Sequence, residues 1–107
     1  MSNHVQQIAK KSDLMHINGS VLRTLNVISG SKCRLSDLEC VFNGINRCCF
    51  LDSLEYLAES EYIELKNGTT GSRTDLETGK FSATNAVLTG KGIRILQGFL
   101  TDECVEV

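Results

Sequence analysis

The side chains that could carry out chemistry do not have the spacing that catalysis or metal binding requires. The chain has two histidines, His4 and His16, and neither lies near a cysteine in sequence. No C-x-x-C pair occurs among the five cysteines, which are Cys33, Cys40, Cys48, Cys49 and Cys104. This spacing matches no zinc site, and the sequence has no G-x-S-x-G motif, P-loop or paired-carboxylate arrangement. The sequence therefore predicts a protein that is not an enzyme and that uses no metal or cofactor.

The adjacent pair Cys48 and Cys49 is the cysteine feature most suggestive of reactivity. It follows Arg47 at the predicted start of a helix, where the helix dipole and a guanidinium both favour a thiolate. One interpretation is therefore a sensor thiol. The alternative is that most of the five cysteines are reduced, buried thiols of a cytosolic protein, and at least one of an odd number cannot pair within the chain.

The net charge of −2 conceals an uneven distribution along the chain. The residues up to Arg34 carry +4, those from Leu35 to Leu65 carry −6, those from Lys66 to Arg94 carry +3, and the tail carries −3. A phosphate-binding surface would therefore have to use the first and third of these segments rather than the acidic second one.

Length and composition indicate a single domain. A chain of 107 residues can bury a core without disulfides or metals. It contains no run of 18 apolar residues and no signal-peptide pattern. We therefore expect a cytoplasmic protein that does not enter a membrane.

Hydrophobic periodicity divides the chain into two parts. Residues 1–17 carry Val5, Ile8 and Met15 at roughly helical spacing, which predicts an N-terminal arm or short helix. Residues 18–107 carry the stronger patterns and are predicted to form the domain itself.

The pattern of the second part predicts a definite order of elements. A first helix is expected to begin at Asn18 or Ser20, either of which can act as N-cap, and to end at Gly30. The other expected elements are a helix capped by Ser36, a turn at Asn43-Gly44, a helix capped by Asn46, a strand at 62–66, a loop over 66–80, a strand at 81–88 and a last helix capped by Thr89. This order predicts an α+β fold.

The same patterns identify the expected core. The residues predicted to be nearly fully buried are Leu25, Leu38, Leu54, Leu57 and Ile63. Further residues expected on the inward faces of the helices are Val41, Phe42, Phe50, Leu51, Ala58, Ile93, Leu96 and Leu100.

Two stretches of the sequence resemble winged-helix regulators. Residues 53–65 (SLEYLAESEYIEL) resemble the end of that family's recognition helix and the strand after it. Residues 87–96 (VLTGKGIRIL) resemble its Leu-Thr-x-x-Gly start of the helix after the wing. The resemblance implies a winged helix-turn-helix with a three-helix core, a two-stranded wing and a C-terminal helix. The size of the chain is also similar to that of small winged-helix proteins of phage and prophage gene clusters.

The resemblance further implies where DNA would be contacted. In that family the contacts come from the first half of the recognition helix and from basic residues of the wing. The matching residues are Asn46, Arg47, Cys49, Ser53, Tyr56, Arg73 and Lys80. Asp52 departs from the family pattern, which often has a basic or neutral polar residue at that position. A carboxylate there opposes phosphate binding, although it can accept a hydrogen bond from the cytosine N4 amine.

We therefore expect a small winged-helix DNA-binding protein, a transcriptional regulator that binds double-stranded DNA. Because operators are usually read as paired half-sites, a homodimer is expected, formed through residues 1–17 or the closing helix. The alternative is a protein–protein interaction module that docks its partner on the acidic third helix. Under that alternative, Arg47, Arg73 and Lys80 are ordinary solvated charges.

Overall fold

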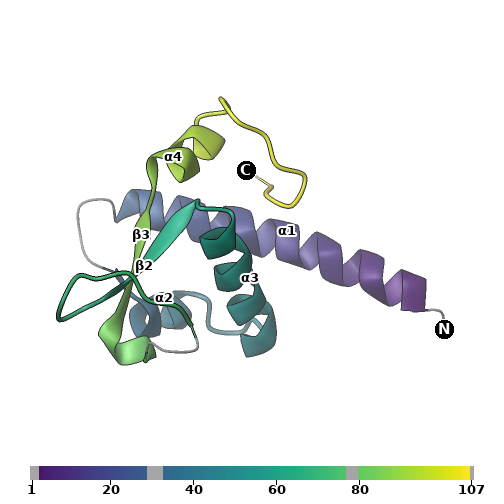
Figure 1. Ribbon diagram of the computed structural model, residues 1–107. Helices are drawn as coiled ribbons and strands as arrows, with labels where there is room; N and C mark the ends of the chain where they lie inside the picture. Colours follow the sequence, from purple (N-terminus) through teal and green to yellow (C-terminus); the bar gives the residue numbers. More distant parts are fainter. Residues whose placement is uncertain (1–2, 29–32, 77–79, 107) are drawn as a thin grey trace.

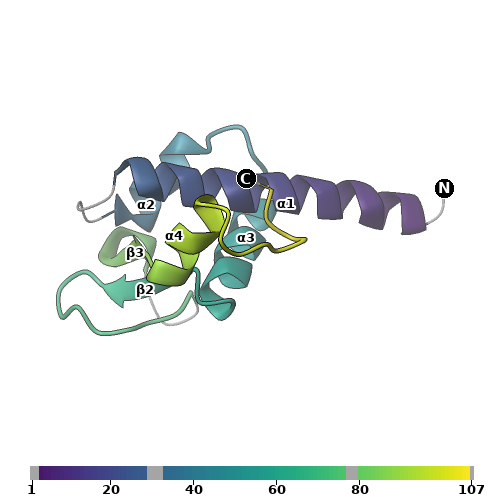
Figure 2. The same cartoon turned by 90° about the horizontal axis from the view of Figure 1, so that it is seen from above.

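The longest element of the chain is a single helix, α1 (Asn3–Val27), whose N-terminal part extends beyond the rest of the molecule (Figures 1 and 2). The computed structural model describes residues 3–28, 33–76 and 80–106, and their side chains from residue 13 onward. The helix runs continuously through position 18, so the prediction that Asn18 or Ser20 caps a new helix is wrong. Gly30, its predicted end, lies outside the described residues.

Tertiary contacts explain why the helix does not break at Asn18-Gly19, two residues with low helix propensity. Asn18 is fully buried, and its side-chain amide nitrogen donates to the carbonyl of Cys104, 2.7 Å away. At Gly19, an added Cβ would lie 1.7 Å from the carbonyl oxygen of Glu106. The C-terminal tail is therefore seated against α1 at a position that only glycine allows.

Two further helices follow, α2 (Leu35–Val41) and α3 (Arg47–Glu59). Asn46 caps α3 as predicted, because its side-chain oxygen accepts from the amide of Cys48 at 2.8 Å. The N-cap of α2 is Arg34 rather than Ser36, and it makes no side-chain capping bond. The turn between the helices includes Gly44 with φ +102°, a conformation that favours glycine.

A three-stranded antiparallel sheet covers one side of the helices, in the order β1-β3-β2. Its strands are β1 (Cys33–Arg34), β2 (Ile63–Asn67) and β3 (Thr84–Leu88), and Leu65 lies opposite Ala86 in the β2–β3 register. The sequence did not predict β1, because two residues are too short to show alternation. The expected strand at 81–88 begins later than predicted, since a 3-10 turn, η1 (Phe81–Ala83), precedes β3.

The last helix, α4 (Gly90–Leu96), is capped by Thr89 as predicted, with the Gly92 amide donating to the threonine hydroxyl at 3.1 Å. Its inward face differs from the prediction, because Ile95 is buried while Ile93 is 36% exposed. Gly92 sets this orientation: a Cβ there would lie 2.3 Å from the carbonyl oxygen of Tyr62, so this side of α4 lies directly on the chain before β2. After α4 the tail is not helical and returns to α1 (Figure 1).

The core lies between α1, α3 and the sheet. All five residues predicted to be nearly fully buried are 3% exposed or less: Leu25, Leu38, Leu54, Leu57 and Ile63. Val41 was expected to face inward but is 63% exposed, since it ends the short helix α2. Within the described ranges the protein is thus a small α+β domain of four α-helices and one three-stranded antiparallel sheet, and α1 crosses the predicted division at residue 17.

Candidate functional site: the outer face of α3

The N-terminal end of α3 carries one cation, Arg47, and the structure engages it on two sides. Its Nε lies 3.2 Å from a carboxylate oxygen of Glu39 on α2, and its guanidinium carbon lies 5.0 Å from the ring centre of Phe81 in η1. Lys80 directly precedes Phe81 and is exposed. The fold therefore brings two of the predicted contact residues, Arg47 and Lys80, to the same end of α3, beside the exposed cap Asn46.

Ser53, another predicted contact residue, is fully buried and offers no surface to a nucleic acid. Its hydroxyl donates to the side-chain oxygen of Asn18 at 2.5 Å. The buried stripe of α3 consists of Phe50, Ser53, Leu54 and Leu57. Leu51 and Ala58 were also expected on the inward face of this helix, but both are only partly buried. The helix is thus rotated so that Ser53 faces the core.

Tyr56 is half-buried and is held by the C-terminal tail rather than presented freely. Its hydroxyl donates to a carboxylate oxygen of Asp102 at 2.7 Å, and the hydroxyl of Tyr62 donates to the same oxygen at 2.6 Å. The other oxygen accepts from the Cys104 amide at 2.8 Å. Nothing in the sequence identified Asp102, because the pairing spans 46 residues and follows no local pattern.

The pKa values of this cluster follow from its geometry. Burial, together with the hydrogen bond to Asp102, raises the pKa of Tyr62 to about 12, and the pKa of Tyr56 is raised for the same reasons. Burial also acts to raise the pKa of Asp102. Hydrogen bonds from Tyr62, Tyr56 and the Cys104 amide outweigh it and keep that pKa below its ordinary value. The cluster is therefore an ionised carboxylate between two neutral phenols, which suits it to fastening the tail.

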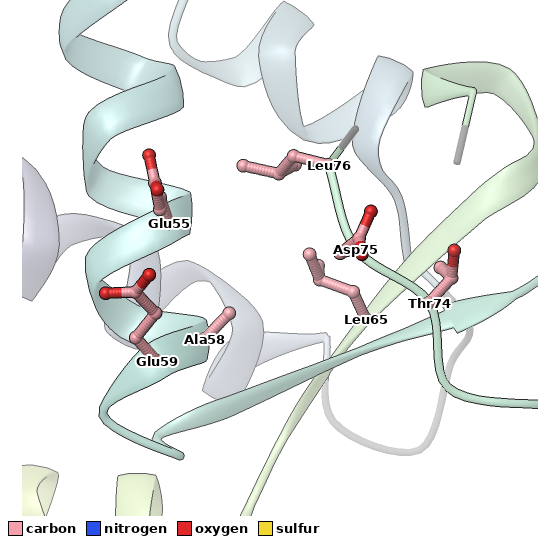
Figure 3. A pocket seen from close by; sticks show the side chains of 7 residues that line it. All are labelled: Glu55, Ala58, Glu59, Leu65, Thr74, Asp75 and Leu76. Atoms are coloured by element: carbon pink, nitrogen blue, oxygen red, sulfur yellow. The ribbon is translucent and has the colours of Figure 1, made fainter. Parts of the chain in front are cut away.

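The opposite face of α3 borders a cleft of about 320 Å³ (Figure 3). Glu55, Ala58 and Glu59 line it from the helix, Leu65 lines it from β2, and Thr74, Asp75 and Leu76 line it from the loop after β2. The close-up shows Leu65 and Leu76 directed into the space between the helix and the loop. The cleft thus combines an apolar floor with acidic walls.

The two glutamates of the cleft have no ion-pair partner among the described residues. Neither Glu55 nor Glu59 forms a side-chain hydrogen bond or ion pair with any residue in the described part of the chain. Asp52, one turn before them, is likewise exposed and unpaired among these residues. The outer face of α3 therefore presents three carboxylates to solvent.

Two basic residues near the cleft, Lys66 of β2 and Arg73 of the following loop, lie close to a carboxylate on β2. The Arg73 and Lys66 side chains approach the carboxylate of Glu64 at 3.9 and 3.6 Å. Glu64 and Leu65 are consecutive residues of β2, so their side chains lie on opposite faces of the sheet. Since Leu65 lines the cleft, Arg73 is directed to the far side of β2. Arg73 is therefore directed away from α3, the helix that lies with Leu65 along the cleft.

The cysteines are free thiols in differing environments. Cys33 is buried, and burial followed by the nearby charge of Asp37 raises the pKa of its thiol. Cys40 and Cys48 are exposed, whereas Cys49 and Cys104 are partly buried, so the expectation that most of them are buried is wrong. Cys49 lies at the first turn of α3, and its proposed sensor role stays a prediction.

No group of three or more histidine, cysteine, aspartate or glutamate side chains in the described part of the chain is placed to hold a metal ion. Among the helices described, none has the length and apolar character needed to cross a membrane.

Comparison with known proteins adds no family to this description. No protein-family model, curated protein or solved structure matches the chain. The surface chemistry of α3 is therefore the basis on which a function can be proposed.

Proposed function

We propose that the chain is a winged-helix-type domain that binds a protein partner through the outer face of α3 and the adjoining β2–β3 loop. The order of its helices and strands, with the sheet order β1-β3-β2, is compatible with such a fold. In that fold α3 corresponds to the recognition helix and the β2–β3 loop to the wing, the two elements that usually meet a ligand.

The observation that carries this proposal is the charge of α3. Its exposed acidic residues, Asp52, Glu55 and Glu59, are opposed on the helix only by Arg47, which already pairs with Glu39. A duplex laid along this helix would bring its phosphates against three carboxylates, which repel them. A partner with a basic surface meets the same carboxylates as complementary charges.

DNA binding is the second candidate, and the position of Arg47 and Lys80 favours it. Arg47 lies at the N-terminal end of α3 over the ring of Phe81, and Lys80 directly precedes Phe81 in the chain. This is the end that a helix-turn-helix inserts into the major groove. Asn46 and Cys49 lie at the same end, so a small regulator could contact DNA there while its acidic residues remain outside the groove. Such a regulator is expected to be a symmetric dimer, which sedimentation at tens of micromolar would reveal.

One substitution, Asp52→Asn, separates the two functions because they require opposite effects. The full chain is titrated with a mixed-sequence DNA duplex and, separately, with an octapeptide of alternating arginine and leucine. Protein binding predicts that Asp52→Asn weakens the peptide complex by about two- to five-fold, as expected for one exposed charge pair. DNA binding predicts that it strengthens the duplex complex by a similar factor, and that duplex affinity falls steeply between about 50 and 200 mM salt.

The control is Glu103→Gln, which removes the same charge from an exposed position in the tail. It should leave both affinities within about two-fold of the unaltered chain, because this charge lies on the tail and not on the outer face of α3, and isolated exposed charges contribute little. Protein binding through α3 is refuted if the octapeptide does not bind at all or if Asp52→Asn leaves its affinity unchanged.

A further inference from the structure

We propose that the cleft between α3 and the β2–β3 loop holds an arginine side chain of the partner protein. This inference rests on the proposed protein-binding function and names the group that the site takes. The first support is the size of the cleft, about 320 Å³, which is at the lower end of the range for pockets that hold small ligands. An α-helix, 10–12 Å across with its side chains, does not fit into it, whereas a single long side chain does.

The floor of the cleft is apolar, as is the aliphatic part of an arginine side chain. Ala58 and Leu76 are partly buried residues that pack on the core, and Leu65 is 4% exposed. These three residues come from α3, the loop and β2, so the apolar floor is formed only where the elements meet (Figure 3). Long basic side chains bury their methylene groups on such surfaces and keep the charged end near water.

The acidic walls of the cleft are complementary in charge to the guanidinium end of an arginine side chain. Glu55 and Glu59 are four residues apart on one side of α3, and like charges at this spacing repel each other. Both are unpaired among the described residues, so no ion pair has to be broken when a cation enters. A cation between them relieves this repulsion, which gives the site a preference for positive charge beyond simple attraction.

Arginine fits this combination better than lysine does. The guanidinium group is planar, is less strongly hydrated than an ammonium group, and offers five N–H donors that can reach two carboxylates together. Its flat faces also tolerate contact with leucine side chains. Lysine provides one compact, strongly hydrated charge and is expected to bind with lower affinity.

The experiment uses the isotope-labelled full chain and a capped pentapeptide with one arginine between two leucines. Two matched peptides carry lysine or the neutral isostere citrulline in place of arginine. Amide shifts of Ala58, Glu59 and the 74–76 segment locate binding. We expect the citrulline peptide to bind about three- to ten-fold more weakly than the arginine peptide, the range for one charge-assisted contact near the surface. The lysine peptide should lie between them.

Two variants test the walls and the floor separately. Glu59→Gln, which keeps the shape of the wall, should reduce the preference for arginine over citrulline to about two-fold or less. Leu76→Ser should weaken all three peptides alike, because it removes apolar contact and no charge. Glu103→Gln serves as the charge control and should change neither quantity.

Several results would contradict the proposal that the cleft is an arginine site. Some of them would leave the proposed protein-binding function intact. Equal affinity for arginine and citrulline, or shifts centred on η1 or the tail, would show that the cleft is not an arginine site. If the alternating octapeptide still binds and is weakened by Asp52→Asn, protein binding by α3 stands without this pocket. If neither peptide binds, the proposed function and the inference fail together.

Discussion

The two faces of α3 differ in whether their polar side chains have hydrogen-bond or ion-pair partners. On the inner side, Ser53 and Tyr56 donate to partners on α1 and the tail, and the buried polar side-chain atoms of the described residues all have partners. On the outer side, Glu55 and Glu59 have no partner in the described ranges. A satisfied polar group contributes to the fold, whereas unpaired exposed charges on an ordered helix remain available for a ligand.

The C-terminal tail has a structural role that differs from the binding role proposed for α3. The tail crosses to α1, where the Glu106 amide donates to the Met15 carbonyl at 3.1 Å. Asp102 holds it to Tyr56 of α3 and to Tyr62, the residue before β2. None of the residues that line the cleft belongs to the tail. The tail therefore stabilises the helix that carries the candidate site without occupying the site.

The largest expected effect is on the inner face. Leu54 is fully buried in the centre of α3, so Leu54→Ala should lower the free energy of unfolding by about 2–5 kcal/mol through lost burial and a residual cavity. Chemical denaturation of the variant and the unaltered chain measures this difference. A loss well under 1 kcal/mol would contradict the helix orientation described here.

A smaller effect is expected from the buried hydrogen-bond network. Ser53→Ala removes the donor that satisfies the Asn18 side-chain oxygen, and a buried acceptor left unpaired costs about 1–3 kcal/mol. The double variant Ser53→Ala with Asn18→Leu, compared with each single change, shows whether the two residues are coupled. Additive losses would mean that the hydrogen bond contributes nothing beyond the separate side chains.

These inner contacts mark the limit of what the sequence could predict. Local signals succeeded: Asn46 and Thr89 were recognised as caps, and the strand at 62–66 was found from alternation. The strand expected at 81–88 was also found, although it begins at Thr84. Contacts between distant segments were not predictable. The pairing of Ser53 with Asn18 joins positions 35 residues apart, and it turned an expected surface contact into a core residue.

The candidate site was predictable in its charge but not in its shape. The excess of acidic residues between Leu35 and Leu65 is visible in the sequence, and it is the basis of the protein-binding alternative. The cleft itself depends on Leu65 and Leu76 converging on α3, which no periodicity indicates. Arg73 was expected to contact DNA from the wing, and its ion pair with Glu64, which directs it to the other face of β2, was not indicated by any local pattern.

A pH-dependent effect tests the attachment of the tail. The folded pKa of Asp102 is depressed, so its contribution to stability is present above the pKa of the unfolded chain and is lost as pH falls through the folded pKa. Asp102→Asn should therefore destabilise the protein at neutral pH and flatten the loss of stability below about pH 4. Thermal unfolding measured from neutral to acidic pH checks this. An unchanged acid profile would mean that other carboxylates control it, and Glu103→Gln is the matched control.

The smallest expected effect on stability is on the outer face of α3. This result would most clearly distinguish the outer face from the inner face, where substitutions are expected to be costly. Glu55→Gln removes one of two like charges four residues apart on α3, with no paired group left behind in the described part of the chain. The free energy of unfolding should change by less than about 0.5 kcal/mol, and relief of repulsion makes a small gain the expected sign. Denaturation at low and high salt measures it, since the gain should shrink as salt screens the charges. A loss of more than about 1 kcal/mol in the free energy of unfolding would show that Glu55 stabilises the fold, as the residues of the inner face do. The outer face could then not be interpreted as a surface that is free to bind a partner.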